Sequence, residues 1–154
     1  TSFGQAGVIL LGVLLGTLMP ITPTQILWVN MVTAVTLSIS LAFDPGERGL
    51  MGRPPRAPGA PLLTGFLLWR VGFVTALMVA GSAWIFADAV AAGRSVEEAR
   101  TLVVNLVVLM EIAYLFNCRA LSSSAFRPAV VTGNPIAIWA VGLIALLQLA
   151  FTYA

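Results

Sequence analysis

Five long apolar runs, separated by short polar or proline-rich stretches, restrict this chain more than any other feature of its sequence. They cover residues 2–19, 24–43, 62–87, 96–118 and 136–153. A helix that crosses the hydrocarbon core of a bilayer needs about 20 mostly apolar residues, and backbone polar groups in lipid must be bonded within their own segment. We therefore predict an all-α fold, a polytopic membrane helix bundle with about five transmembrane helices.

The composition agrees with a lipid environment and excludes several other classes of protein. Hydrophobic residues make up 59% of the chain and charged residues only 9%, whereas a soluble domain has about 25% charged residues. The absence of His and the single Cys118 exclude a His-based metal site and an internal disulfide. A net charge of +2 is too small for a nucleic-acid-binding surface, so we expect no nucleic acid partner.

Prolines, glycines and polar residues separate the runs. Pro20 and Pro23 end the first run and leave a short turn before the second, because proline does not continue a helix. Loop 44–61 holds five prolines and four glycines and is predicted to be non-helical. Ser95 and Glu98 have the spacing of a capping box, which predicts the start of the fourth helix.

The arginines are distributed unevenly along the chain. All eight basic residues are arginines, and six of them lie in or beside loops 44–61 and 119–134. The other two, Arg94 and Arg100, fall on the opposite side of the predicted bundle. Short loops rich in Arg stay in the cytoplasm. We therefore expect a multi-pass protein of the cell membrane, with loops 44–61 and 119–134 cytoplasmic.

Glu111 is the sharpest polar signal within an apolar run. It lies near the middle of the fourth run, where an acidic side chain costs about 2.5–3.5 kcal/mol on insertion scales. Such a residue faces the bundle or water and indicates an ion or proton path, although a protonated carboxyl bonded to a neighbouring helix is the alternative. Tyr114 lies roughly on the same face. Asn105 and Asn117 lie on other faces and are expected to be packing or end groups.

The second run carries four further polar residues: Asn30, Thr33, Thr36 and Ser40. At about 100° per residue they fall within one arc of roughly 120°. Interhelical hydrogen bonding is the favoured explanation for the hydroxyl groups of the two threonines and Ser40, and ion binding is the alternative. Asn30 is either a structural hydrogen-bonding group or an ion ligand.

Gln5 lies in the first run between Gly4 and Gly7, and small neighbours of this kind let another helix approach closely. Its carbonyl oxygen is a possible ligand, and a plain interhelical bond is an equal alternative. Together, the side-chain oxygens of Gln5, Asn30, Thr33 and Glu111 suit a hard cation. A soft-metal site would need more than Cys118.

Several segments resemble a known family when taken together. The stretch "ILWVN" with the following threonine, then "LMGRPPR" and "PLLTG", is similar to the sixth membrane helix and following loop of P-type cation-transporting ATPases, nearest to the calcium-pump-like group. "ARTLVVNLVVLMEIAYLFNCRAL" resembles their eighth helix. The resemblance implies that residues 1–154 are the fifth to ninth helices, a fragment of a ten-helix transport domain.

The same resemblance implies roles for particular residues. Asn30, Thr33 and Glu111 match positions that supply cation ligands in the family. Calcium pumps carry an Asp where this chain has Ala34 and usually a Glu where it has Gln5. Because carboxylate count tunes calcium affinity, the cation stays open between calcium, sodium, potassium, manganese and proton-coupled transport.

The loop after the second run is expected to couple the membrane helices to a cytosolic domain. The resemblance implies a stiff basic segment in this loop, formed by Arg53, Pro54, Pro55 and Arg56. The alternative is an interfacial loop whose arginines follow the positive-inside rule. No Asp-Lys-Thr-Gly motif occurs in the chain, so this fragment should not hydrolyse ATP by itself. Mg-ATP would act only through missing domains.

These expectations define the function and partners. The chain is predicted to be a membrane transport domain of an ATP-driven cation pump, with the bilayer and the remaining helices and cytosolic domains of the parent pump as partners. The alternative is a free-standing small membrane channel or accessory subunit without ATPase activity. A secondary transporter would require an internal repeat, and the sequence contains none.

Overall fold

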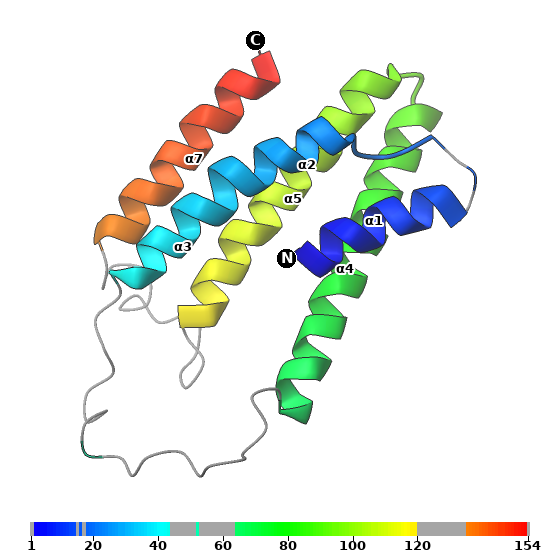
Figure 1. Ribbon diagram of the computed structural model, residues 1–154. Coiled ribbons are helices and arrows are strands. Elements are labelled where there is room, and N and C mark those ends of the chain that lie inside the picture. Colours follow the sequence, from blue (N-terminus) through cyan, green and yellow to red (C-terminus); the bar gives the residue numbers. More distant parts are fainter. Residues whose placement is uncertain are drawn as a thin grey trace.

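The computed structural model describes residues 2–14, 16, 18–43, 52, 64–119 and 135–153. Within these ranges every regular element is a helix, which confirms the predicted all-α fold (Figure 1). The elements are α1 (Ser2–Leu14), α2 (Pro23–Val29), the π-helical segment η1 (Asn30–Ala34), α3 (Val35–Ala42), α4 (Gly65–Ala91), α5 (Val96–Arg119) and α7 (Pro135–Tyr153). Apart from Gly52 and Arg119, the predicted loops 44–61 and 119–134 lie outside the described residues.

Three helices, α4, α5 and α7, are long and apolar enough to cross a membrane. The segments α2, η1 and α3 follow one another without a break and form one rod across the second predicted run (Figure 1). The described chain is therefore a multi-pass membrane bundle. The helix bounds agree with the predicted runs to within a few residues, except in α1.

The first helix is shorter than predicted. It ends at Leu14 rather than Met19. Gly16 adopts a φ of +59°, and its amide donates to the carbonyl of Val13 at 3.2 Å. A left-handed glycine terminates a right-handed helix, so the apolar composition continues to Met19 while the helix does not.

Two capping boxes fix helix starts. In the predicted one, the Glu98 amide donates to the Ser95 hydroxyl at 3.2 Å, and the Ser95 amide donates to the Glu98 carboxylate at 3.3 Å. A second box, formed by Thr22 and Gln25 with Pro23 at the first turn, starts α2. Its T-x-x-Q spacing is a capping-box signature that is already present in the sequence.

Close packing of α1 on α4 depends on two glycines. A Cβ atom at Gly4 would lie 2.5 Å from the Met78 sulfur, and one at Gly7 would lie 2.8 Å from a Val79 methyl. The expectation that small residues beside Gln5 admit another helix is therefore confirmed. The approach brings the polar face of α1 towards the centre of the bundle.

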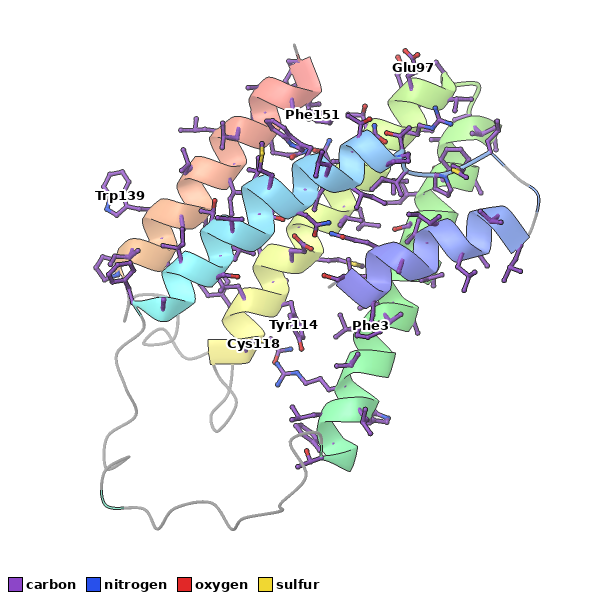
Figure 2. All side chains as sticks on the ribbon, in the orientation of Figure 1. Phe3, Glu97, Tyr114, Cys118, Trp139 and Phe151 are labelled. Atoms are coloured by element: carbon purple, nitrogen blue, oxygen red, sulfur yellow. The ribbon has the colours of Figure 1, made fainter. Side chains whose placement is uncertain are left out.

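Helix α5 is the centre of the bundle, and α4, the α2–η1–α3 rod and α7 all pack on it. Its Val103, Val104 and Val107 are fully buried. At one end of the bundle Trp28 of α2 stacks on Phe151 of α7, with ring centroids 5.2 Å apart (Figure 2). Side chains on the periphery, such as Trp139, point away from the bundle (Figure 2).

A candidate cation site between three helices

At Glu111, polar side chains from three helical segments meet within the bundle. Glu111 lies on α5 and is only 2% exposed. The amide of Gln5, on α1, donates to one carboxylate oxygen at 3.0 Å, and the hydroxyl of Thr33, in η1, lies in hydrogen-bond contact with the other oxygen. Three of the four predicted cation-site residues therefore converge, from three separate helical segments.

The neighbouring packing holds these side chains in place. Gln5 and Thr33 are buried, with exposed fractions of 3% and 0%. Around Glu111 on α5, Val107, Val108 and Leu115 belong to the apolar core. The carboxyl group is thus surrounded by apolar side chains and a few polar groups, an environment in which electrostatic interactions are much stronger than in water.

The segment that carries Thr33 is a π-helix rather than an α-helix, and it spans Asn30–Ala34. π-Helical segments are rare, widen the helix locally and occur frequently at functional sites. The assumption of a uniform 100° per residue through this run is therefore wrong over these five residues. Single-sequence periodicity carries no signal for such a register change.

The Thr33 hydroxyl has two possible acceptors for its single hydrogen. The Thr33 hydroxyl contacts both the Val29 carbonyl and a Glu111 oxygen, yet it carries only one hydrogen. If that hydrogen goes to Val29, the contact with Glu111 needs a proton on the carboxyl group. If it goes to Glu111, the carboxyl group can accept it in the ionised form.

Asn30 is not part of the hydrogen-bonded cluster in this structure. It lies three residues before Thr33 in η1 and is half-buried. Its backbone amide bonds to carbonyls of the preceding turn, and its side chain has no hydrogen bond to another described residue. The prediction that Asn30 is a cation ligand stays a prediction.

The other polar residues of the predicted arc have separate surroundings. Ser40 is buried and donates to the Leu37 carbonyl at 2.8 Å, while Thr36 is half-buried. Tyr114 lies under the guanidinium group of Arg70, whose central carbon is 5.2 Å from the ring centroid. The coupling-loop residues Arg53, Pro54, Pro55 and Arg56, and the side chain of Ala34, lie outside the described residues.

Asn105 and Asn117 make interhelical contacts, as expected for packing groups. The Gln148 amide of α7 donates to Asn105 at 2.7 Å, and the Thr152 hydroxyl lies 3.2 Å from the same oxygen. Arg70 of α4 donates to Asn117 at 2.8 Å. In the part of the chain that the structure describes, no group of three acidic, His or Cys residues lies close enough to hold a metal ion. Gln5 and Thr33, the two partners described above for Glu111, are both neutral side chains.

Comparison with known proteins places this arrangement in context. Residues 18–154 match the sequence profile described as "Cation transporting ATPase, C-terminus". The chain is 46% identical over 153 residues to "Probable cation-transporting ATPase F" of Mycobacterium tuberculosis. The aligned residues make up 99% of this chain and 17% of that protein. No solved structure matches the chain significantly.

Two further relatives have related names. Identity is 30% to "Cation-transporting ATPase pma1" of Synechocystis, over 97% of this chain and 17% of that protein. It is 32% to "Calcium-transporting ATPase" of Bacillus subtilis, over 80% of this chain and 14% of that protein. The chain thus spans less than a fifth of the length of each of these relatives.

Proposed function

Since the chain belongs to the C-terminal region of the P-type cation-transporting ATPases, we propose that it forms part of the intramembrane cation site of an ATP-driven pump. The observation that carries this proposal is the convergence of Gln5, Thr33 and Glu111 from three helical segments. Side-chain oxygens held in this way replace the water around a cation as it crosses the bilayer. Mg-ATP would be bound and hydrolysed by domains outside this chain.

We propose a single hard cation as the cargo of this site. Glu111 supplies one negative charge and Thr33 a neutral oxygen. The Gln5 amide nitrogen faces Glu111 here, so Gln5 supplies its neutral oxygen once the amide has rotated. Calcium sites of higher affinity use more carboxylates, so this set favours a cation of low charge or one divalent ion held weakly. Asn30 lies in the same α2–η1–α3 rod as Thr33. We propose it as the fourth ligand after a displacement of the helices relative to one another.

Transport requires the site to change its affinity during the cycle. The three ligands come from α1, η1 and α5, so a displacement of one segment against the others separates the oxygens. We propose that loop 44–61, with Arg53, Pro54, Pro55 and Arg56, transmits such a displacement from a cytosolic domain. On this proposal loops 44–61 and 119–134 face the cytoplasm of a cell membrane, in agreement with the arginine distribution.

The test uses the full-length pump that contains this chain, reconstituted in vesicles. ATP hydrolysis is measured against the concentration of sodium, potassium, calcium, magnesium and manganese in turn. Thr33→Val removes the hydroxyl with little change of shape, and Thr36→Val is the matched control one turn away. We expect Thr33→Val alone to raise the half-saturating concentration of the stimulating cation, by about tenfold.

Identical cation dependence in the two variants would show that Thr33 has only a packing role. The alternative function, a free-standing channel or accessory subunit, has less support because the matched relatives are cation-transporting ATPases several times longer than this chain. It predicts cation flux through the vesicles without ATP. A flux that requires ATP would exclude it.

A further inference from the structure

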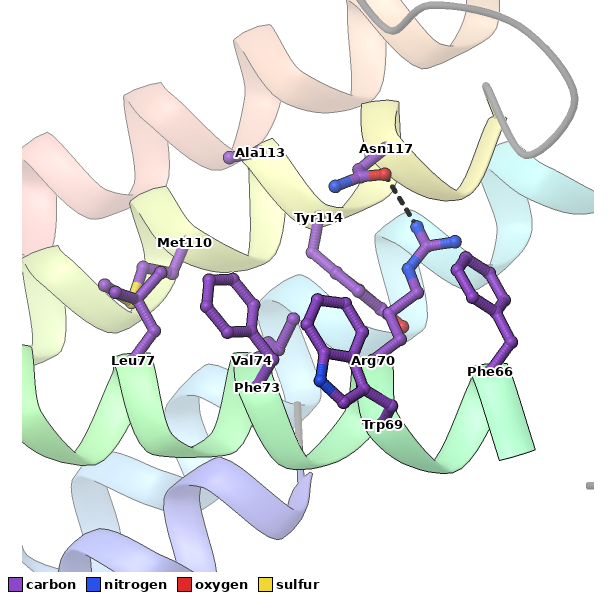
Figure 3. A pocket seen from close by; sticks show the side chains of 10 residues that line it. All are labelled: Phe66, Trp69, Arg70, Phe73, Val74, Leu77, Met110, Ala113, Tyr114 and Asn117. Atoms are coloured by element: carbon purple, nitrogen blue, oxygen red, sulfur yellow. Dashed lines mark hydrogen bonds between the residues drawn. The ribbon is translucent and has the colours of Figure 1, made fainter. Parts of the chain in front are cut away.

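A groove on the surface between α4 and α5 is separate from the Glu111 cluster. Its volume is about 430 Å³, and ten residues line it (Figure 3). Figure 3 shows Arg70, Tyr114 and Asn117 together at one end of the groove, whereas Leu77 and Met110 lie at the other. The groove is therefore polar at one end and apolar along the rest of its length.

Arg70 carries a buried positive charge at the polar end. Its residue is 8% exposed, and its guanidinium group donates to the Asn117 oxygen at 2.8 Å and lies over the Tyr114 ring. The same guanidinium nitrogen also lies 4.0 Å from the Cys118 sulfur. No carboxylate of the described ranges pairs with Arg70. A buried cation without an anion is unfavourable. The guanidinium group has five N–H donors in a planar fork that matches a phosphate.

The position of Arg70 along α4 fits a membrane interface. It lies five residues after Gly65, the first residue of the helix, which is about 7.5 Å of helix rise. Trp69 and Phe73 stack with centroids 5.4 Å apart, and both are more than half exposed beside the groove. Trp side chains such as Trp69 are enriched at the level of the lipid headgroups.

We propose that this groove binds an anionic phospholipid of the surrounding leaflet. The lipid phosphate accepts hydrogen bonds from Arg70 and from the side-chain amide of Asn117. One acyl chain extends along Phe73 and Val74 towards Leu77 and Met110. A phospholipid fits better than a second protein segment, because it supplies the missing anion and the apolar chain in one molecule.

The test is performed on the full-length pump in nanodiscs that contain equal amounts of phosphatidylglycerol and phosphatidylcholine. After transfer to detergent, native mass spectrometry counts the lipids that remain bound. We expect the unmodified pump to retain phosphatidylglycerol selectively. Arg70→Gln is expected to reduce this retention about tenfold, because a charge-assisted contact to phosphate is lost. Arg94→Gln is the matched control, as Arg94 is exposed at the other end of α4 and distant from the groove.

A second variant leaves Arg70 intact in case Arg70→Gln does not assemble. Ala113 lines the groove from α5, so Ala113→Phe fills the space of the acyl chain. It is expected to reduce phosphatidylglycerol retention as strongly as Arg70→Gln. Equal retention by the unmodified pump and Ala113→Phe would overturn the proposal. Equal retention of both lipids would also overturn it, as would a cross-link from the variant Ala113→Cys to another segment of the pump.

Discussion

The side-chain amide of Gln5 donates a 3.0 Å hydrogen bond to the carboxyl group of Glu111, although 106 positions separate the two residues. The bond joins α1 to α5 inside the bundle, and both side chains are buried. A neutral donor here satisfies the carboxyl group without adding charge. A carboxylate in place of Gln5 would instead require a proton or a cation between the two groups. On the proposed function, residue 5 therefore influences the charge that the site accepts.

Glu111→Gln is predicted to weaken cation-stimulated ATP hydrolysis by the full-length pump. The amide keeps the size of the side chain, so assembly should be largely intact, but the negative charge that attracts the cation is lost. A loss of about 10- to 100-fold in apparent cation affinity is expected from one charged ligand. Glu97→Gln is the matched control, because Glu97 is exposed in the first turn of α5. Unchanged cation dependence in Glu111→Gln would favour a purely structural carboxyl group.

Gln5→Glu is predicted to shift the site towards divalent cations. It places a second carboxylate within hydrogen-bond distance of Glu111, and two such groups are stable together only with bound positive charge. Protons then compete with the cation, so apparent affinity should fall more steeply as the pH decreases than in the unmodified pump. The measurement is ATP hydrolysis against calcium and sodium concentration at several pH values. A parallel pH dependence in both proteins would count against this prediction.

Ala34→Asp is predicted to raise the affinity for divalent cations relative to monovalent ones. The residue follows Thr33 directly and belongs to η1, and an added carboxylate near a cation site strengthens calcium binding. Equilibrium binding of radioactive calcium to the purified pump measures the effect. Ala42→Asp, at the end of α3, is the control for added charge in the same rod. Equal calcium binding in the two variants would place residue 34 outside the site.

Gly7→Ala is predicted to destabilise the packing of α1 on α4 by about 1–3 kcal/mol, the usual cost of overpacking. The new methyl group would lie 2.8 Å from a methyl of Val79, a β-branched side chain with little freedom to move. Gly72→Ala is the control, because nothing lies within 4 Å of its added Cβ. Thermal unfolding of the detergent-solubilised pump should show a lower Tm for Gly7→Ala only. Equal Tm values would mean that α1 shifts at little cost.

Local sequence patterns were sufficient for parts of this architecture. The start of α5 was readable in the Ser95 and Glu98 spacing, since a capping box depends on residues within one turn. The end of α1 was not readable in the sequence, because the turn at Gly16 interrupts an apolar run whose composition does not change. Likewise, the π-helical geometry of η1 has no counterpart in the hydropathy pattern.

The sequence alone determined that the chain is a membrane protein, that its fold is helical and roughly where its helices begin and end. The reason is that a chain in lipid must bond its backbone within apolar helices. The sequence also identified Glu111 as a residue that must face the interior. Only the tertiary structure decided that Gln5 and Thr33 are its partners and that Asn30 is not. Those contacts join residues 106 and 78 positions apart, and they depend on how closely the helices pack and on a local change of helical register.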